Sequence, residues 1–213
     1  MMKEKRKPIS KEEYIADPCG ASSLAFWKAE SFDIPEGMKI YREDEFSAEK
    51  CIGKDEPYFK LMHTLSSVPR AALSNEFELT GADAEELTEH INGCYDEERV
   101  SVDELKAYDR RKVFDASLWI AVRDRKTGKI VASGIAELDA RIGEGSLEWV
   151  QVSHDYRRKG LGRFVVCELL KHLSQQADFV TVSGRVNGTD DPLSFYKSCG
   201  FDNQVIWHIV TLP

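Results

Sequence analysis

The stretch that decides the fold runs from Val150 to Arg163 and reads Val-Gln-Val-Ser-His-Asp-Tyr-Arg-Arg-Lys-Gly-Leu-Gly-Arg. Apolar residues before Ser153 indicate the end of a strand, and apolar positions beyond Gly160 recur at helical spacing. The turn between them therefore leads into a helix N-terminus. Glycines at 160 and 162 would let the backbone approach an anion, which the first-turn N–H groups and the helix dipole attract.

Basic side chains surround this turn, namely Arg157, Arg158, Lys159 and Arg163. Together with the glycines they predict a turn that binds a pyrophosphate. A basic, glycine-containing turn on a solvated surface is the alternative interpretation. The spacing excludes a Walker loop, and two glycines without a third make a poor dinucleotide fingerprint.

Helices and strands are expected on both sides of the turn. Downstream we expect a helix after Gly160, a strand over 179–182, a helix opened by Asp191-Pro192, and a strand over 205–210. Upstream we expect a strand over 76–80, helices opened by Asp83 and Ser101, and strands over 118–122, 130–138 and 147–152. A strand, a crossover helix and a second strand make a parallel pair. The sequence thus predicts an α/β fold, with a mixed, mostly antiparallel sheet, a central parallel strand pair and flanking helices.

Two motifs resemble a known family. Arg157-x-x-Gly160-x-Gly162 resembles the acyl-CoA signature of the GNAT superfamily of N-acetyltransferases. The segment from Phe195-Tyr196 to Gly200-Phe201 resembles that family's second landmark, a Tyr-bearing helix that ends in Gly-Phe. The resemblance extends from about Phe77 to Val210 and implies a GNAT acyl-CoA fold over residues 73–213.

The resemblance also implies a set of residues that bind acetyl-CoA as co-substrate. The strand backbone before the signature would hold the pantetheine arm, and the turn would cradle the pyrophosphate. Asn187 would contact CoA after the next strand, although an Asn-Gly turn explains it equally well. The full set is Val150, Gln151, Val152, Arg157, Arg158, Lys159, Gly160, Leu161, Gly162, Arg163 and Asn187.

Two residues are candidates for acid–base chemistry in a direct attack of an amine on the thioester, through a tetrahedral intermediate. Glu148 is the best placed carboxylate to serve as general base, directly or through water. Its alternative is a side chain that pairs with a basic residue or faces solvent. Tyr196 is the expected proton donor to the departing thiolate, and its alternative is a core tyrosine.

Composition limits the partners. A formal net charge of −8 lacks the basic surplus typical of nucleic-acid binding and suits a cationic acceptor. We expect N-acetyl transfer to a primary amine of a small molecule, such as a polyamine, aminoglycoside or amino acid, or of a protein or peptide. A catalytically weak acyl-CoA-binding regulatory module is the alternative. The resemblance leaves a monomer and a homodimer open.

The N-terminal third lies outside the resemblance. Residues 1–17 offer little to bury and are expected to be a flexible tail, whereas residues 18–72 are rich in aromatics and are expected to pack on the core and shape the acceptor side. Five cysteines without a Cys-x-x-Cys pair favour reduced thiols in a cytoplasmic protein without a metal site. No apolar run approaches ~18 residues, so we expect no membrane segment.

Overall fold

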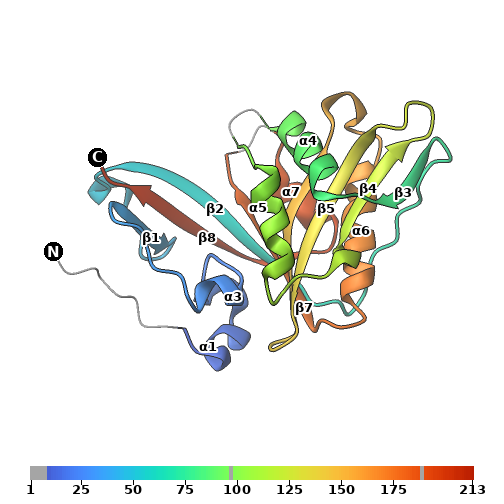
Figure 1. Cartoon of the computed structure of the whole chain (residues 1–213). Helices are drawn as coiled ribbons and strands as arrows, with labels where there is room; N and C mark the ends of the chain where they lie inside the picture. Colours follow the sequence, from blue (N-terminus) through green and yellow to red (C-terminus); the bar gives the residue numbers. More distant parts are fainter. Residues whose placement is uncertain (1–8, 96–97, 188–189) are drawn as a thin grey trace. The chain divides into compact units, whose positions relative to one another are not determined.

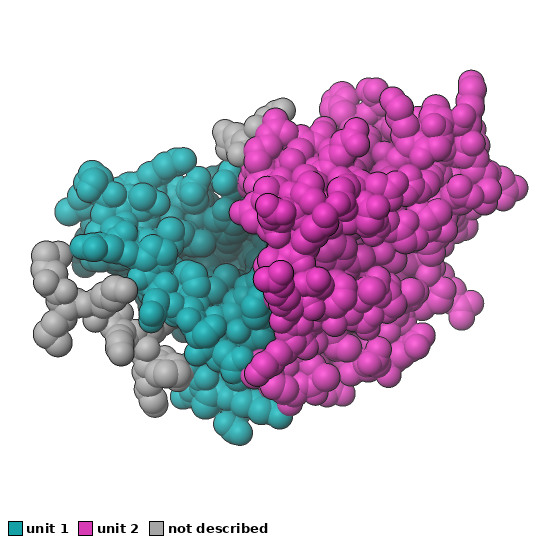
Figure 2. All heavy atoms as spheres, viewed as in Figure 1, with its two compact units in different colours: residues 1–64, 181–213 teal, residues 65–180 magenta. Residues whose placement is uncertain are grey.

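A computed structural model gives the structure of the protein and describes residues 9–95, 98–187 and 190–213. The chain divides into two compact units, which are coloured separately in Figure 2. Unit 1 comprises residues 1–64 and 181–213, and unit 2 comprises residues 65–180. The stretch from Val150 to Arg163 therefore belongs entirely to unit 2.

Figure 1 shows the helices and strands along the chain. The α-helices are α1 (Lys11–Ala16), α2 (Pro18–Ala21), α3 (Phe26–Ala29), α4 (Ala84–Cys94), α5 (Val102–Lys106), α6 (Leu161–Leu173) and α7 (Pro192–Ser198). Short 3-10 helices are η1 (Ala48–Lys50), η2 (Ala107–Arg110), η3 (Ala116–Leu118) and η4 (His154–Tyr156). Within the described ranges, no helix has the length and apolar character needed to cross a membrane.

The strands are β1 (Met38–Arg42), β2 (Lys54–His63), β3 (Phe77–Gly81), β4 (Trp119–Asp124), β5 (Ile130–Asp139), β6 (Glu144–Val152), β7 (Phe179–Arg185) and β8 (Asp202–Thr211). In the described part of the chain they form an eight-stranded sheet in the order β1-β8-β2-β7-β6-β5-β4-β3. The sheet is mostly antiparallel, and β6 and β7, joined through the crossover helix α6, form its parallel pair. The predicted α/β fold is confirmed.

In unit 2, α4 and α6 cover opposite faces of the strands. Gly134 of β5 faces α6, because a Cβ there would lie 2.5 Å from Cγ1 of Val165. Side chains alternate along a strand, so Ser133 and Ile135 face the other side. Ile135 belongs to the same buried cluster as Leu87 of α4. The apolar residues whose helical spacing predicts α4 therefore form the face of this helix that packs on the sheet.

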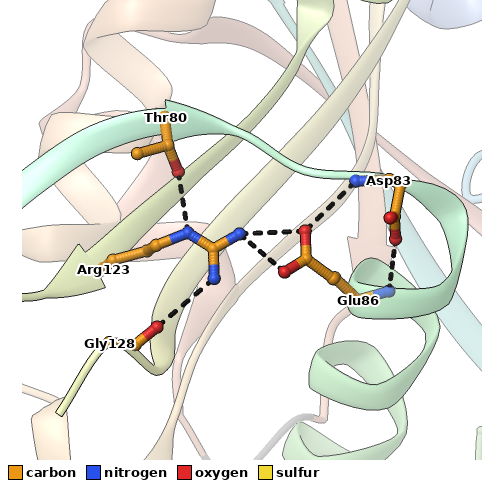
Figure 3. Close-up of polar contacts among 5 residues, drawn as sticks. All are labelled: Thr80, Asp83, Glu86, Arg123 and Gly128. Carbon is orange, nitrogen blue, oxygen red and sulfur yellow. Dashed lines mark hydrogen bonds and ion pairs between the residues drawn. The ribbon is translucent and has the colours of Figure 1, made fainter.

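The N-terminus of α4 is tied to the edge of the unit 2 sheet (Figure 3). Asp83 caps the helix, with its Oδ1 accepting a 2.9 Å hydrogen bond from the backbone N–H of Glu86. Arg123 of β4 donates through Nη2 to both carboxylate oxygens of Glu86, at 2.8 and 2.9 Å. The same guanidinium donates to Thr80 Oγ1 and to the Gly128 carbonyl. These contacts thus anchor the N-terminus of α4 to strands β3 and β4.

Unit 1 contains an anchor for its N-terminal helices. Lys60 of β2 is buried, and its Nζ donates to the Tyr14 hydroxyl at 2.9 Å, the Ser22 carbonyl at 3.0 Å and the Leu24 carbonyl at 2.6 Å. Tyr14 lies in α1 and is fully buried. The part of the expected tail that the structure describes is therefore helical and packed from Lys11 onward, while residues 1–8 lie outside the described residues.

Element boundaries differ from expectation where tertiary packing decides them. Strand β6 begins at Glu144, three residues before the expected start, because Gly145 lies inside the strand and faces Leu173. Strands β1 and β2 were not expected, since their stretch has no clear strand periodicity. The expected hairpin turn after β4 is present, and Gly128 takes the positive φ of 71°.

Candidate active site

The turn between β6 and α6 is open at the helix N-terminus. Arg158 and Gly160 take positive φ angles of 64° and 81°. The first intrahelical hydrogen bond of α6 runs from the N–H of Phe164 to the carbonyl of Gly160 at 3.0 Å, so the N–H groups of residues 161–163 precede it. A Cβ built on Gly160 meets no heavy atom within 4 Å. Such an open helix start can hold an anionic group.

Side-chain contacts hold the turn in place. The Tyr156 hydroxyl donates a 2.8 Å hydrogen bond to Oδ2 of Asp124, and this bond lowers the pKa of Asp124 below its ordinary value. Arg157 Nε donates to the carbonyl of Val152 at 3.3 Å. The ammonium of Lys159 lies 4.6 Å from the centre of the Tyr156 ring. The turn is therefore attached to both the β4–β5 hairpin and the end of β6.

Ten of the expected binding residues lie together in unit 2. The strand contributes three of them, and the turn with the first helical residues contributes the others. Arg157 and Arg163 are half-buried, whereas Arg158 and Lys159 are exposed. They are Val150, Gln151, Val152, Arg157, Arg158, Lys159, Gly160, Leu161, Gly162 and Arg163. Their role in binding a ligand stays a prediction.

Strand β6 carries a β-bulge directly upstream of these residues. Trp149 pairs with Ile135 and Leu147 pairs with Ala136, so Glu148 is the extra residue on β6. A bulge leaves one residue out of the ladder and redirects its side chain. Bulges are frequent beside active sites, and this one falls on the carboxylate that the sequence singles out as a base.

The Glu148 side chain is half-buried and has a polar neighbour on its own strand. The Ser146 hydroxyl donates to Oε1 of Glu148 at 3.2 Å. The next residue, Trp149, donates through Nε1 to the Tyr108 hydroxyl at 3.3 Å. Glu148 thus lies beside a hydroxyl and next to an aromatic cluster, a setting that can orient a carboxylate.

A second carboxylate lies near the aromatic cluster but is engaged in an ion pair. Glu137 of β5 is buried, and Arg111 lies 2.5 Å from its Oε1. The guanidinium carbon of Arg111 stacks 3.2 Å from the centre of the Tyr108 ring. This ion pair gives Glu137 a structural role, and the role of Glu148 in proton transfer stays a prediction.

The other two expected site residues belong to unit 1. Tyr196 of α7 is 8% exposed and packs against the rings of Phe59 and Phe201, with centroids 6.2 and 5.6 Å away. Asn187 is exposed in the turn after β7. Tyr196 therefore has the surroundings of a core aromatic, and its proton-donor role stays a prediction.

The sequence analysis did not single out His90, which contributes to the site region. This histidine of α4 is 8% exposed and contacts Ser133 and Ser153. Its place three residues after Leu87, on the apolar side of the helix, is the signal that it is buried. Among the residues the structure describes, no group of three or more His, Cys, Asp and Glu side chains is arranged to hold a metal ion.

Comparison with solved structures gives matches to 210 chains. A GCN5-related N-acetyltransferase from Sphaerobacter thermophilus matches with a TM-score of 0.68 and 16% identity, over 83% of this chain and 60% of that chain. An acetyltransferase of the GNAT family from Novosphingobium aromaticivorans matches with a TM-score of 0.55 and 12% identity, over 85% and 70% of the two chains. At such identities these likenesses establish the fold.

A smaller relative matches over nearly its whole length. The ribosomal-protein-S18-alanine N-acetyltransferase from Escherichia coli has a TM-score of 0.50 and 15% identity, over 64% of this chain and 95% of that chain. The chain spans 60% of the Sphaerobacter protein. A comparison with curated proteins gives no match. Residues 114–203 match the family model described as an acetyltransferase (GNAT) domain, so the chain carries a domain of the GNAT acetyltransferase family.

Proposed function

We propose that the protein transfers the acetyl group of acetyl-CoA to a primary amine. The observation that carries this proposal is the turn from β6 into α6, in which positive φ angles at Arg158 and Gly160 open a helix N-terminus among basic side chains. Such a start favours a pyrophosphate through backbone N–H groups and the helix dipole. The GNAT domain match over residues 114–203 supports acyl transfer.

In this proposal the end of β6 binds the acyl-bearing arm of the cofactor. The backbone of residues 150–152 would hydrogen-bond the pantetheine, and the turn with the start of α6 would bind the pyrophosphate. Acetyl-CoA would supply the activated thioester, while the chain supplies orientation. Holding both reactants in an attack geometry is itself a large contribution to the rate.

The reaction needs a neutral amine. At pH 7, deprotonating a lysine amine with a pKa of ~10.4 costs about 4.6 kcal/mol, whereas an α-amine near ~7.8 costs about 1 kcal/mol. Glu148, at the bulge of β6, would accept the proton directly or through water. The amine nitrogen then bonds to the thioester carbon, and collapse of the tetrahedral intermediate breaks the C–S bond. Tyr196 would donate a proton to the thiolate.

The acceptor is best sought among amines of several kinds. The net charge of −8 favours cationic acceptors such as polyamines and aminoglycosides. The likeness to an enzyme whose name specifies a ribosomal-protein alanine adds peptides that begin with alanine to the candidates. Lysine-containing peptides and free amino acids complete the panel.

A two-part experiment tests the proposal. Calorimetry measures acetyl-CoA binding to the full chain, and a thiol-reactive dye then follows CoA release with each amine of the panel. Binding together with amine-dependent release is the expected result. Binding without release by any amine would point instead to a regulatory acyl-CoA-binding module, and absence of binding would refute the proposal.

A further inference from the structure

A chain of hydrogen bonds runs between α4 and the end of β6. The His90 imidazole approaches Ser133 Oγ with Nδ1 at 2.8 Å and Ser153 Oγ with Nε2 at 3.0 Å. Gln151 of β6 donates through Nε2 to the same Ser133 oxygen. His90, Ser133 and Gln151 are each less than a tenth exposed. One buried ring thus connects a helix with β5, with β6 and with the first residue after β6.

One assignment of donors and acceptors satisfies the contacts of His90 with the two serines. Burial lowers the pKa of His90 to about 4, so the ring is neutral at pH 7 and has one N–H and one acceptor nitrogen. Ser133 accepts from Gln151, which leaves its hydroxyl proton for Nδ1. The ring N–H is then on Nε2 and donates to Ser153. The Cys94 sulfur lies 3.6 Å from the same Nε2.

These hydrogen bonds involve residues at the C-terminal end of β6. The N–H of Ser153 donates to the Val131 carbonyl at 2.9 Å, and η4 follows at once. Gln151 lies two residues earlier, and its Oε1 is buried without a hydrogen-bond partner among the described residues. The Ser133 contact is therefore what orients this amide. The ion pair between Glu86 and Arg123 anchors the start of α4 to β4 (Figure 3), and α4 is the helix that carries His90.

We infer that His90 is a positioning residue that holds the end of β6 and the start of the phosphate-binding turn in register for acetyl-CoA. The inference rests on the proposed function, because it assigns the ligand to the backbone of residues 150–152 and the turn beyond. His90 acts through Gln151 and Ser153 and takes no part in proton transfer to the substrate. Its loss therefore affects cofactor binding more than the chemical step.

Three variants test the inference. His90→Leu removes both hydrogen bonds and keeps an apolar side chain, while His90→Gln keeps one donor and one acceptor. Thr88→Val is the matched control, because Thr88 is buried on the same helix and its Oγ1 has no hydrogen-bond partner within the described ranges. Calorimetry gives the acetyl-CoA Kd of each, steady-state kinetics gives kcat at saturating acetyl-CoA, and urea unfolding checks that each variant is folded.

We expect the acetyl-CoA Kd of His90→Leu to rise roughly tenfold, the size of one lost hydrogen bond, with a smaller change in kcat. His90→Gln should recover most of the affinity, and Thr88→Val should bind as the wild type does. Equal affinities of wild type and His90→Leu would overturn the inference, and so would an equal loss in Thr88→Val, while leaving the proposed function intact. A wild-type protein that binds no acetyl-CoA would instead overturn the proposed function and this inference with it.

Discussion

The Ser146 hydroxyl donates a 3.2 Å hydrogen bond to Oε1 of Glu148, two residues further along β6. Glu148 is the extra residue of the bulge in this strand, so its side chain leaves the regular alternation of the sheet. The Ser146 hydroxyl thus helps to orient the carboxylate of Glu148. A general base on β6 needs an oriented carboxylate, and the contact with Ser146 provides that orientation.

Replacing Glu148 by Gln tests its proposed role as base. The change keeps the size of the side chain and removes its ability to accept a proton, so kcat/KM for the acceptor should fall about 10²-fold at pH 7. The loss should shrink as the pH rises toward the pKa of the amine, because solvent then deprotonates the nucleophile. The measurement is a pH–rate profile between pH 6 and 9.

Glu78→Gln serves as the control for this profile. Glu78 lies on the edge strand β3 and pairs with Arg125 at the surface, so its charge is removed without touching β6. The control variant should follow the wild-type profile. A Glu148→Gln enzyme that also follows it would exclude Glu148 as the base.

Replacing Tyr196 by Phe tests the proposed proton donor. The aromatic ring keeps its packing against Phe59 and Phe201, whereas the hydroxyl is lost. Because the thiolate of CoA is a tolerable leaving group, kcat should fall by about 10- to 10³-fold, with acetyl-CoA affinity nearly unchanged. Alkaline pH should not restore the rate. Wild-type kcat in this variant would leave Tyr196 as a packing residue only.

Gly160 and Gly128 form a matched pair for testing the phosphate-binding turn. Both have positive φ angles, 81° and 71°, and a Cβ on either meets no heavy atom within 4 Å. Alanine at each position should therefore lower the free energy of unfolding by a similar amount, about 1 to 2 kcal/mol. Only Gly160→Ala should weaken acetyl-CoA binding, by tenfold or more, because the new methyl group enters the space assigned to the pyrophosphate. Equal acetyl-CoA affinities of the two variants would contradict this assignment.

Acid should destabilise the protein through His90. Burial lowers its pKa to about 4 in the folded state, compared with 6.5 for the ordinary residue, so below pH 6.5 the unfolded chain binds the proton first. The contribution to stability is complete above pH 6.5 and is lost as the pH falls toward 4, by at most about 3 kcal/mol. Urea unfolding of wild type and His90→Gln between pH 4 and 7.5 measures it. If the free energy of unfolding depends on pH in the same way in both proteins, His90 is not the source of the acid destabilisation.

The sequence predicts unit 2 well because local signals there agree with the packing. Asp83 caps α4, and the apolar positions Leu87 and Ile91 become buried at the sheet. The glycines before α6 mark the turn. The bulge at Glu148 escapes prediction, because a bulge shifts the alternation of side chains without changing the composition of the strand.

Unit 1 is less predictable because distant contacts determine it. Strand β2 contains Lys60, a residue type that is usually exposed, and its burial depends on acceptors from Tyr14, Ser22 and Leu24. No local pattern in the sequence announces those partners. The position of His90 on the apolar side of α4 indicates that it is buried, but its partners Ser133 and Ser153 lie far away along the chain and cannot be predicted locally.

Gly134 and Gly93 test how α6 packs on the sheet. A Cβ on Gly134 of β5 would lie 2.5 Å from Val165 Cγ1 and 2.8 Å from Leu169 Cδ1. These side chains of α6 must therefore shift in Gly134→Ala, which should destabilise the fold by about 1 to 3 kcal/mol. Gly93 is an exposed residue of α4 with no heavy atom within 4 Å of such a Cβ, so Gly93→Ala should stabilise by about 0.5 to 1 kcal/mol. Urea unfolding at pH 7 compares the two variants with the wild type. Because α6 begins at the phosphate-binding turn, Gly134→Ala should also weaken acetyl-CoA binding, and a stable Gly134→Ala protein with unchanged affinity would contradict the close packing described for α6.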